Sequence, residues 1–102
     1  MTRSVDIVIV GAGPEAVAAA IQSAQRGQRV LMVVRSRAAG VDRRLRHSIR
    51  AAGRIIAQRI SILTGAEVEC VAGVRAIEAV LVRRLDTNQC VDVNASALLN
   101  LQ

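Results

Sequence analysis

The stretch that decides the fold is VIVGAGPEAVAAAI, residues 8–21. It opens with a run of β-branched residues, which is typical of a strand buried on both faces. Gly11 and Gly13 follow as a turn. Pro14 then suits the first turn of a helix, where the N–H that proline lacks is not needed. The pattern therefore predicts a buried strand over 5–10 that leads through a glycine turn into an alanine-rich helix.

The next segments continue this alternation. We expect the helix to cover 14–26 and to end before Gly27, because glycine suits the position just past a helix. A second buried strand is expected over 29–34. Strand, helix and strand within about 30 residues form a right-handed βαβ unit with parallel strands. This part of the chain therefore predicts an α/β fold.

A second helix is predicted over 43–59, with Asp42 as its cap. Apolar residues at helical spacing give it one buried side. Gly53 should weaken this helix without ending it. Another face is basic, which predicts a solvated surface; the alternative is docking of an acidic partner or of nucleic acid. The residues of this basic face are Arg43, His47, Arg50 and Arg54.

The last third of the chain changes its pattern. A strand is predicted over 60–71, with a bend at Gly65, and its first part, about 60–64, should join the parallel sheet. An antiparallel ribbon is predicted from 76 to 95. The final strand, 97–101, should return to the parallel sheet. The expected fold is a Rossmann-like, three-layer parallel sheet with an antiparallel β-ribbon.

The composition limits what such a domain can do. The 102 residues include no aromatic side chain, which argues against single-stranded nucleic-acid binding. The net charge is +6 and every cation is an arginine, which pairs with phosphate through two parallel hydrogen bonds. Cys70 and Cys90 lie too far apart for a zinc or redox motif. We expect one domain over residues 1–102, located in the cytoplasm, with no membrane contact.

The glycine turn has the pattern of a dinucleotide-binding loop, with two glycines and an alanine at the required spacing. The first glycine permits a tight turn, the second lets a pyrophosphate approach the backbone, and the alanine lets helix and strand pack closely. The pyrophosphate would lie at the helix N-terminus. The alternative is a turn that serves packing alone. The predicted cofactor-binding residues of this loop are Gly11, Ala12, Gly13, Pro14, Glu15 and Ala16.

The end of the second strand bears on the choice of cofactor. Dinucleotide folds that bind NAD usually carry an acid there, which hydrogen-bonds to the ribose, whereas arginine accommodates the 2′-phosphate of NADP. This sequence has Arg35, Ser36 and Arg37 after Val34, and Arg43 follows in the next helix. These residues predict an NADP(H) site. The alternative is a solvated basic loop.

The order of these parts resembles the NADPH-binding domain of the flavoprotein disulfide reductases, especially the low-molecular-weight thioredoxin reductases. The resemblance implies NADP(H) as cofactor and a flavoprotein domain or subunit as partner. The segments that carry it are the glycine loop with Ala16 and Val17, VVRSR (33–37), ISILTGAEVECVAG (60–73) and AIEAVLVRRLDTNQCVDVNASALL (76–99).

The sequence also departs from that family. The CxxC dithiol expected just before the first strand is absent, as are the FAD domain and its linkers. The last strand normally runs into a glycine near the cofactor, whereas here it reads Asn100, Leu101, Gln102. The opening MTRSVDIVIVGAGP is also typical of an FAD domain, so FAD is the alternative ligand.

Two classes of function remain open at this point. The first is an NADP(H)-binding domain or subunit of a flavin-dependent oxidoreductase, which presents the nicotinamide to a flavin on another domain or chain. The second is a non-catalytic nucleotide-binding module, a truncated remnant, or the FAD-binding half of a flavoprotein. We expect no turnover from the chain alone, and a homo-oligomer also remains open.

Overall fold

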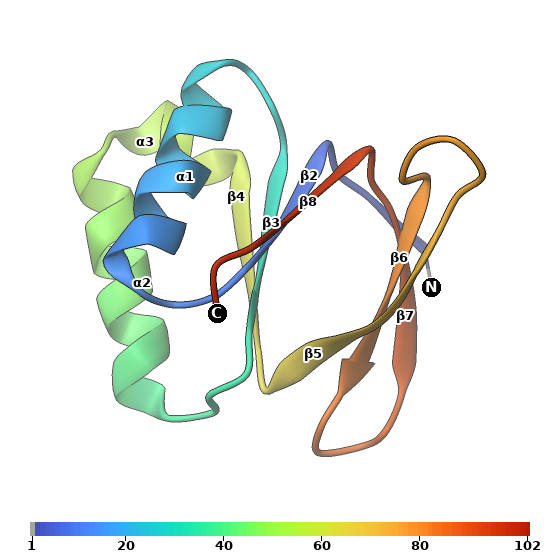
Figure 1. The fold of residues 1–102 in the computed structure, drawn as a ribbon. Coiled ribbons are helices and arrows are strands. Elements are labelled where there is room, and N and C mark those ends of the chain that lie inside the picture. The colour runs from blue at the N-terminus through green and yellow to red at the C-terminus, as the bar shows by residue number, and fades with distance from the viewer. Residues whose placement is uncertain (1) are drawn as a thin grey trace.

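A computed structural model describes residues 2–102, so that Met1 of the predicted domain lies outside the description. The described residues form three layers: helices, a parallel sheet, and a second sheet that contains the ribbon (Figure 1). The helices are α1 (Pro14–Gln25), α2 (Ala39–Ala51) and α3 (Arg54–Gln58). The strands are β1 (Thr2–Ser4), β2 (Ile7–Val10), β3 (Val30–Val34), β4 (Ile60–Thr64), β5 (Ala66–Ala72), β6 (Ala79–Arg84), β7 (Cys90–Asn94) and β8 (Ala97–Asn100).

The parallel sheet has the strand order β4-β3-β2-β8. All three of its pairings are parallel, and β8 returns beside β2 as the sequence predicted. Every residue of β3 is buried because the helices cover one face of the sheet and the second sheet covers the other. The chain proceeds from β2 to β3 and β4 on one side, whereas β8 lies on the other side of β2. The strand order therefore reverses at β2.

Two apolar cores lie on the two faces of the parallel sheet, because alternate residues of a strand point to opposite faces. Ile9 and Met32 pack toward the helices, where Ala20 of α1 is also fully buried. Val8 and Leu31 pack toward the second sheet. Aliphatic side chains fill both cores, since the sequence offers no aromatic residue.

The second sheet has the order β1-β7-β6-β5. The pair β6–β7 is antiparallel, which confirms the ribbon predicted over 76–95, and β5 adds to it antiparallel to β6. Strand β1, which was not predicted, adds to β7 in parallel. The single strand expected over 60–71 is instead two strands in two sheets. Gly65, with φ +63°, permits the turn between them.

The second predicted helix differs from the expectation at both of its boundaries. Helix α2 already begins at Ala39, so Asp42 is not its cap but lies in its first turn, where its Oδ2 lies 3.0 Å from Nε of Arg46. Gly53 does end the helix. Its φ of +118° is a conformation that L residues rarely adopt, and the chain then starts α3. The continuous helix over 43–59 was therefore a wrong prediction.

Helix α1 ends as predicted: Gly27, with φ +88°, lies just past its C-cap. Among the helices of residues 2–102, none combines the length and the apolar character needed to cross a membrane.

Candidate nucleotide-binding site

The carboxyl edge of the parallel sheet brings several loops together (Figure 1). The glycine loop follows β2, a loop over 35–38 follows β3, Gly65 follows β4, and Leu101 follows β8. Ligands of open α/β sheets bind outside the carboxyl ends of the strands, where the strand order reverses. The reversal at β2 and the glycine loop therefore coincide at the edge where a ligand is expected.

Gly11 forms the tight turn that the sequence predicted. It is buried, its φ is +139°, and its N–H donates to the carbonyl oxygen of Val33 at 3.1 Å. A Cβ at this position would lie 3.4 Å from the Cβ of Ala16, which is itself fully buried. Small residues at both positions thus let α1 pack closely on β2.

The space where Gly13 would carry a Cβ is open. It is the N-cap of α1, and a Cβ added to it would meet no atom within 4 Å. No side chain caps the helix, and the first hydrogen bond of the turn runs from the N–H of Val17 to the carbonyl of Gly13. The N–H groups of the first turn before it have no partner within the helix. An anion can therefore approach these groups over Gly13 without a side chain in its path.

A cavity of about 540 Å³ adjoins this loop between α1 and α2. Helix α2 contributes Arg44 and Ser48, which were not predicted as site residues, whereas Arg43 is not part of the lining. Arg44 and Ser48 are four residues apart and flank the buried Leu45, so helical periodicity could have placed them on the side facing α1. The lining residues are Ala12, Gly13, Pro14, Val17, Ala18, Ile21, Arg44, Leu45 and Ser48.

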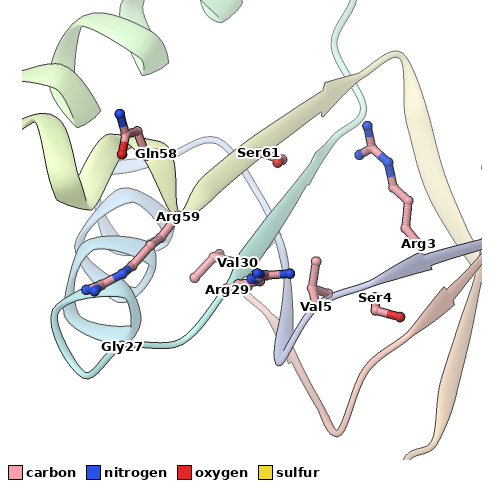
Figure 2. A pocket seen from close by; sticks show the side chains of 9 residues that line it. All are labelled: Arg3, Ser4, Val5, Gly27, Arg29, Val30, Gln58, Arg59 and Ser61. Atoms are coloured by element: carbon pink, nitrogen blue, oxygen red, sulfur yellow. The ribbon is translucent and has the colours of Figure 1, made fainter.

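A second cavity, of about 530 Å³, lies at the opposite edge, where the parallel strands begin (Figure 2). Arg3, Arg29 and Arg59 line it. The Arg59 guanidinium donates from Nη1 to the carbonyl oxygen of Ala24 at 2.9 Å, in the last turn of α1. Such carbonyls carry partial negative charge, which a guanidinium stabilises. Arg59 thus complements a helix end, at the edge of the sheet away from the glycine loop.

The predicted phosphate-binding residues after β3 are all exposed, but each already has a neighbour. Ser36 Oγ accepts a hydrogen bond from the N–H of Ala38 at 3.2 Å. The Arg37 side chain lies over Gly65, where a Cβ would come within 2.6 Å of its Cγ. Arg35 Nε lies 3.9 Å from Glu67 Oε2. The structure therefore groups Ser36 and Arg37 around the β4–β5 junction and directs Arg35 toward the second sheet.

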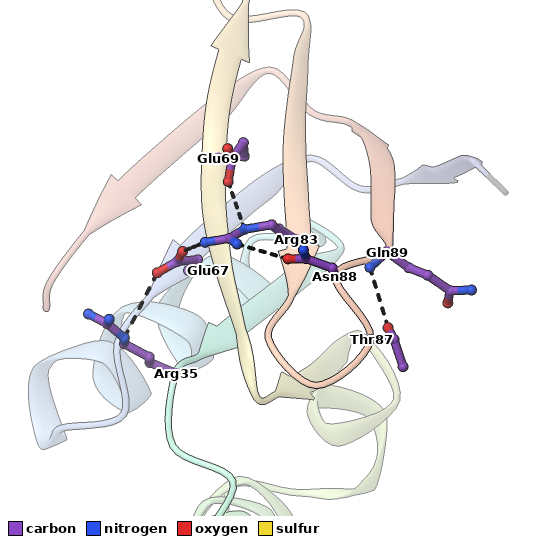
Figure 3. Close-up of polar contacts among 7 residues, drawn as sticks. All are labelled: Arg35, Glu67, Glu69, Arg83, Thr87, Asn88 and Gln89. Carbon is purple, nitrogen blue, oxygen red and sulfur yellow. Dashed lines mark hydrogen bonds and ion pairs between the residues drawn. The ribbon is translucent and has the colours of Figure 1, made fainter.

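Glu67 belongs to a polar cluster on β5 and β6 that sequence reasoning missed (Figure 3). Arg83 Nη2 donates to Glu67 Oε1, and Arg83 Nη1 donates to Asn88 Oδ1 at 2.9 Å. Arg83 Nε lies 2.9 Å from Glu69 Oε2 in an ion pair. The hydrogen bond with Glu67, followed by the charge of Glu69, raises the pKa of Arg83 above its ordinary value. Arg83 is thus held in its charged form between two carboxylates.

Neither a metal centre nor a dithiol emerges from the described part of the chain. Residues 2–102 contain no group of three or more His, Cys, Asp or Glu side chains that could hold a metal ion. Cys70 and Cys90 are both free and exposed. The polar groups next to the glycine loop are the backbone N–H groups of the first turn of α1 and the side chains of Arg44 and Ser48.

Comparison with known proteins agrees with this geometry. Residues 6–41 match the family described as FAD dependent oxidoreductase. No match is found among curated proteins. A thioredoxin reductase from Streptococcus pyogenes MGAS5005 has 24% identity and a TM-score of 0.72 over 97% of this chain and 31% of its own.

Other solved structures share the same fold. Thioredoxin reductase from Giardia duodenalis has 19% identity and a TM-score of 0.72, over 97% of this chain and 31% of its own. The Mycobacterium smegmatis Sdh1 complex in the apo form has 14% identity and a TM-score of 0.75, over 97% of this chain and 34% of its own. The chain shares with these proteins a Rossmann-like α/β fold built on a parallel sheet. It spans between 31% and 34% of the length of these three proteins.

Proposed function

We propose that the chain is the dinucleotide-binding part of a flavin-dependent oxidoreductase and that residues 1–102 form one such domain. The observation that carries this proposal is the open space over Gly13, at the N-terminus of α1 and at the reversal of strand order. The pyrophosphate of the ligand lies there, held by backbone N–H groups of the first helical turn. Arg44 and Ser48 line the adjoining cavity and offer further hydrogen-bond donors.

The preferred ligand in this proposal is NADP(H). Arg35 and Arg37 follow β3, and the nearest carboxylate in the sequence after that strand is Asp42, inside α2. Arginine at this position accommodates a 2′-phosphate, whereas NAD sites usually carry an acid. The alternative ligand is FAD, which the match of residues 6–41 to FAD dependent oxidoreductases favours.

The residues of this chain bind and orient the cofactor, and the partner is a flavoprotein domain or subunit. When bound, NADPH would supply a hydride for the flavin of the partner and would leave as NADP+. The glycine loop fixes the pyrophosphate, and the arginines after β3 fix the adenosine end. No side chain of the site is assigned a proton-transfer role, so the proposal includes no turnover by the chain alone.

The test is a side-by-side titration with NADPH, NADH and FAD at fixed ionic strength. Isothermal calorimetry suits it, because a chain without aromatic residues gives no intrinsic fluorescence signal. Binding of at least one dinucleotide is expected, with NADPH the tightest. Failure of all three to bind at millimolar concentration would overturn the proposal, and tight binding of FAD alone would assign the chain to the alternative.

A matched pair of variants tests the glycine loop itself. Gly13→Val places a branched side chain in the open space over the helix N-terminus and should abolish binding while the fold is retained. Gly40→Val adds the same side chain in α2, where a Cβ also meets no atom within 4 Å, and should leave binding intact. Normal binding by Gly13→Val would show that the loop serves packing alone.

A further inference from the structure

A carboxylate from the second sheet faces the arginine that follows β3. Glu67 lies on β5, whereas Arg35 follows the second strand of the parallel sheet, and their Oε2 and Nε atoms are 3.9 Å apart (Figure 3). The hydrogen bond from the N–H of Gly65 to the carbonyl of Ser36, at 3.2 Å, attaches the start of β5 to the same loop. The ribbon is therefore part of the surroundings of the adenosine end of the site.

A second arginine holds the Glu67 side chain in this place. Arg83 of β6 lies opposite Glu67 in the strand register and donates to its other carboxylate oxygen. The side chain of Glu67 is 28% exposed, whereas that of Arg35 is 66% exposed. Glu67 is thus the fixed member of the pair, and Arg35 is the member that is free to change partners.

The charges of this cluster cancel. Glu67 and Glu69 carry two negative charges, and Arg35 and Arg83 carry two positive charges. A 2′-phosphate at the loop after β3 carries up to two further negative charges and takes Arg35 as one of its partners. It meets Glu67 chiefly as a competitor for that guanidinium, because the charge of Glu67 is already paired with Arg83.

We infer that Glu67 is a specificity-determining residue, which competes for Arg35 and thereby weakens the preference of the site for a 2′-phosphate. The inference rests on the proposed function, because it concerns the adenosine end of the same site.

Two adenosine phosphates isolate this effect. 2′,5′-ADP carries the 2′-phosphate of NADP and 5′-AMP does not, so the ratio of their affinities reports on the 2′-position alone. Glu67→Gln removes the competing charge and should raise the affinity ratio of 2′,5′-ADP over 5′-AMP about three- to tenfold at low salt. The rise should shrink with added salt, because both partners are partly exposed.

The chain offers a matched control in Glu69. It pairs with the same Arg83, whereas no contact to Arg35 is found among the described residues. Glu69→Gln therefore removes the same charge from the cluster and should leave the ratio unchanged. In an Arg35→Ala background, Glu67→Gln should lose most of its effect, because the guanidinium for which it competes is gone.

Each outcome decides the inference. An equal rise in Glu67→Gln and Glu69→Gln, or a full rise in the Arg35→Ala background, would overturn it and leave the proposed function standing. Absence of 5′-AMP and 2′,5′-ADP binding from every variant would overturn the inference, whereas the titration with NADPH, NADH and FAD decides the proposed function separately. If circular dichroism shows that Glu67→Gln is unfolded, Glu67→Asp takes its place in the test. The shorter side chain keeps the negative charge but withdraws it from Arg35. A smaller rise in the affinity ratio is then expected.

Discussion

The carbonyl group of Leu101 lies directly over the backbone of Gly11. A Cβ at Gly11 would be 3.0 Å from that oxygen, and the N–H of Leu101 donates to the carbonyl of Val10 at 2.8 Å. The segment after β8 therefore covers the start of the glycine loop, and residues 90 positions apart in the chain fix its shape together. Gly11 is needed both for its positive φ of +139° and for this close approach.

Gly11→Ala should lower the free energy of unfolding by about 2–3 kcal/mol, through a strained φ and the contact with Leu101. Gly27→Ala is the matched control, because Gly27 also has positive φ but no atom within 4 Å of its added Cβ. It should cost about 1 kcal/mol. Urea unfolding followed by far-ultraviolet circular dichroism measures both. Equal losses in the two variants would contradict a role for the Leu101 contact.

Replacement of glycine by alanine should have opposite effects on stability at Gly53, where helix α2 ends, and at Gly40, which lies within it. Gly53 has φ +118°, so Gly53→Ala should destabilise the domain by about 1–3 kcal/mol. Gly40 lies inside α2 with ordinary helical backbone and open space around it, so Gly40→Ala should stabilise the domain by about 0.5–1 kcal/mol. Thermal unfolding distinguishes the two signs. A stabilised Gly53→Ala would mean that α2 and α3 fuse into one helix, as the sequence pattern suggested.

Much of the fold could be predicted because its signals are local. The β-branched runs of β2 and β3, the glycine spacing between them and the position of Gly27 each report on a few neighbouring residues. The boundary at Gly53 could not be predicted, because helical periodicity continues through it and only the backbone angle shows the break. Strand β1 was missed because its pairing depends on β7, at the other end of the chain.

The candidate site also has a part that local sequence predicts and a part that depends on distant residues. The glycine loop was predictable from its spacing, and Gly11, Gly13 and Ala16 have surroundings that suit the expected roles. The contact between Arg35 and Glu67 joins two sheets, so no short window of sequence contains it. Arg44, rather than Arg43, lines the cavity, because the packing of α2 against α1 decides which arginine faces the loop.

The buried side of α2 should dominate its contribution to stability. Leu45 is 1% exposed in the core between the helices and the parallel sheet, and Leu45→Ala should cost about 2–4 kcal/mol. Ile55, on α3, is 66% exposed, and Ile55→Ala should change the free energy of unfolding by less than about 0.5 kcal/mol. Urea midpoints at constant m-value test the pair. A large loss in Ile55→Ala would indicate that a partner surface covers it in solution.

The choice between NADPH and NADH tests the arginines after β3. A hydrogen bond to a charged group contributes about 1.5–3 kcal/mol, but solvent screens these exposed side chains and Glu67 competes for Arg35. We therefore expect NADPH to bind about tenfold more tightly than NADH. Replacing Arg35 and Arg37 together by Ala should bring the two affinities together and leave NADH binding unchanged.

The control is the double replacement of Arg50 and Arg54 by Ala, which removes the same charge from exposed positions beyond the loop. It should keep the ratio of the two affinities. Equal affinities in the unmodified protein, or the same loss of preference in the control, would show that the loop after β3 contributes only general positive charge.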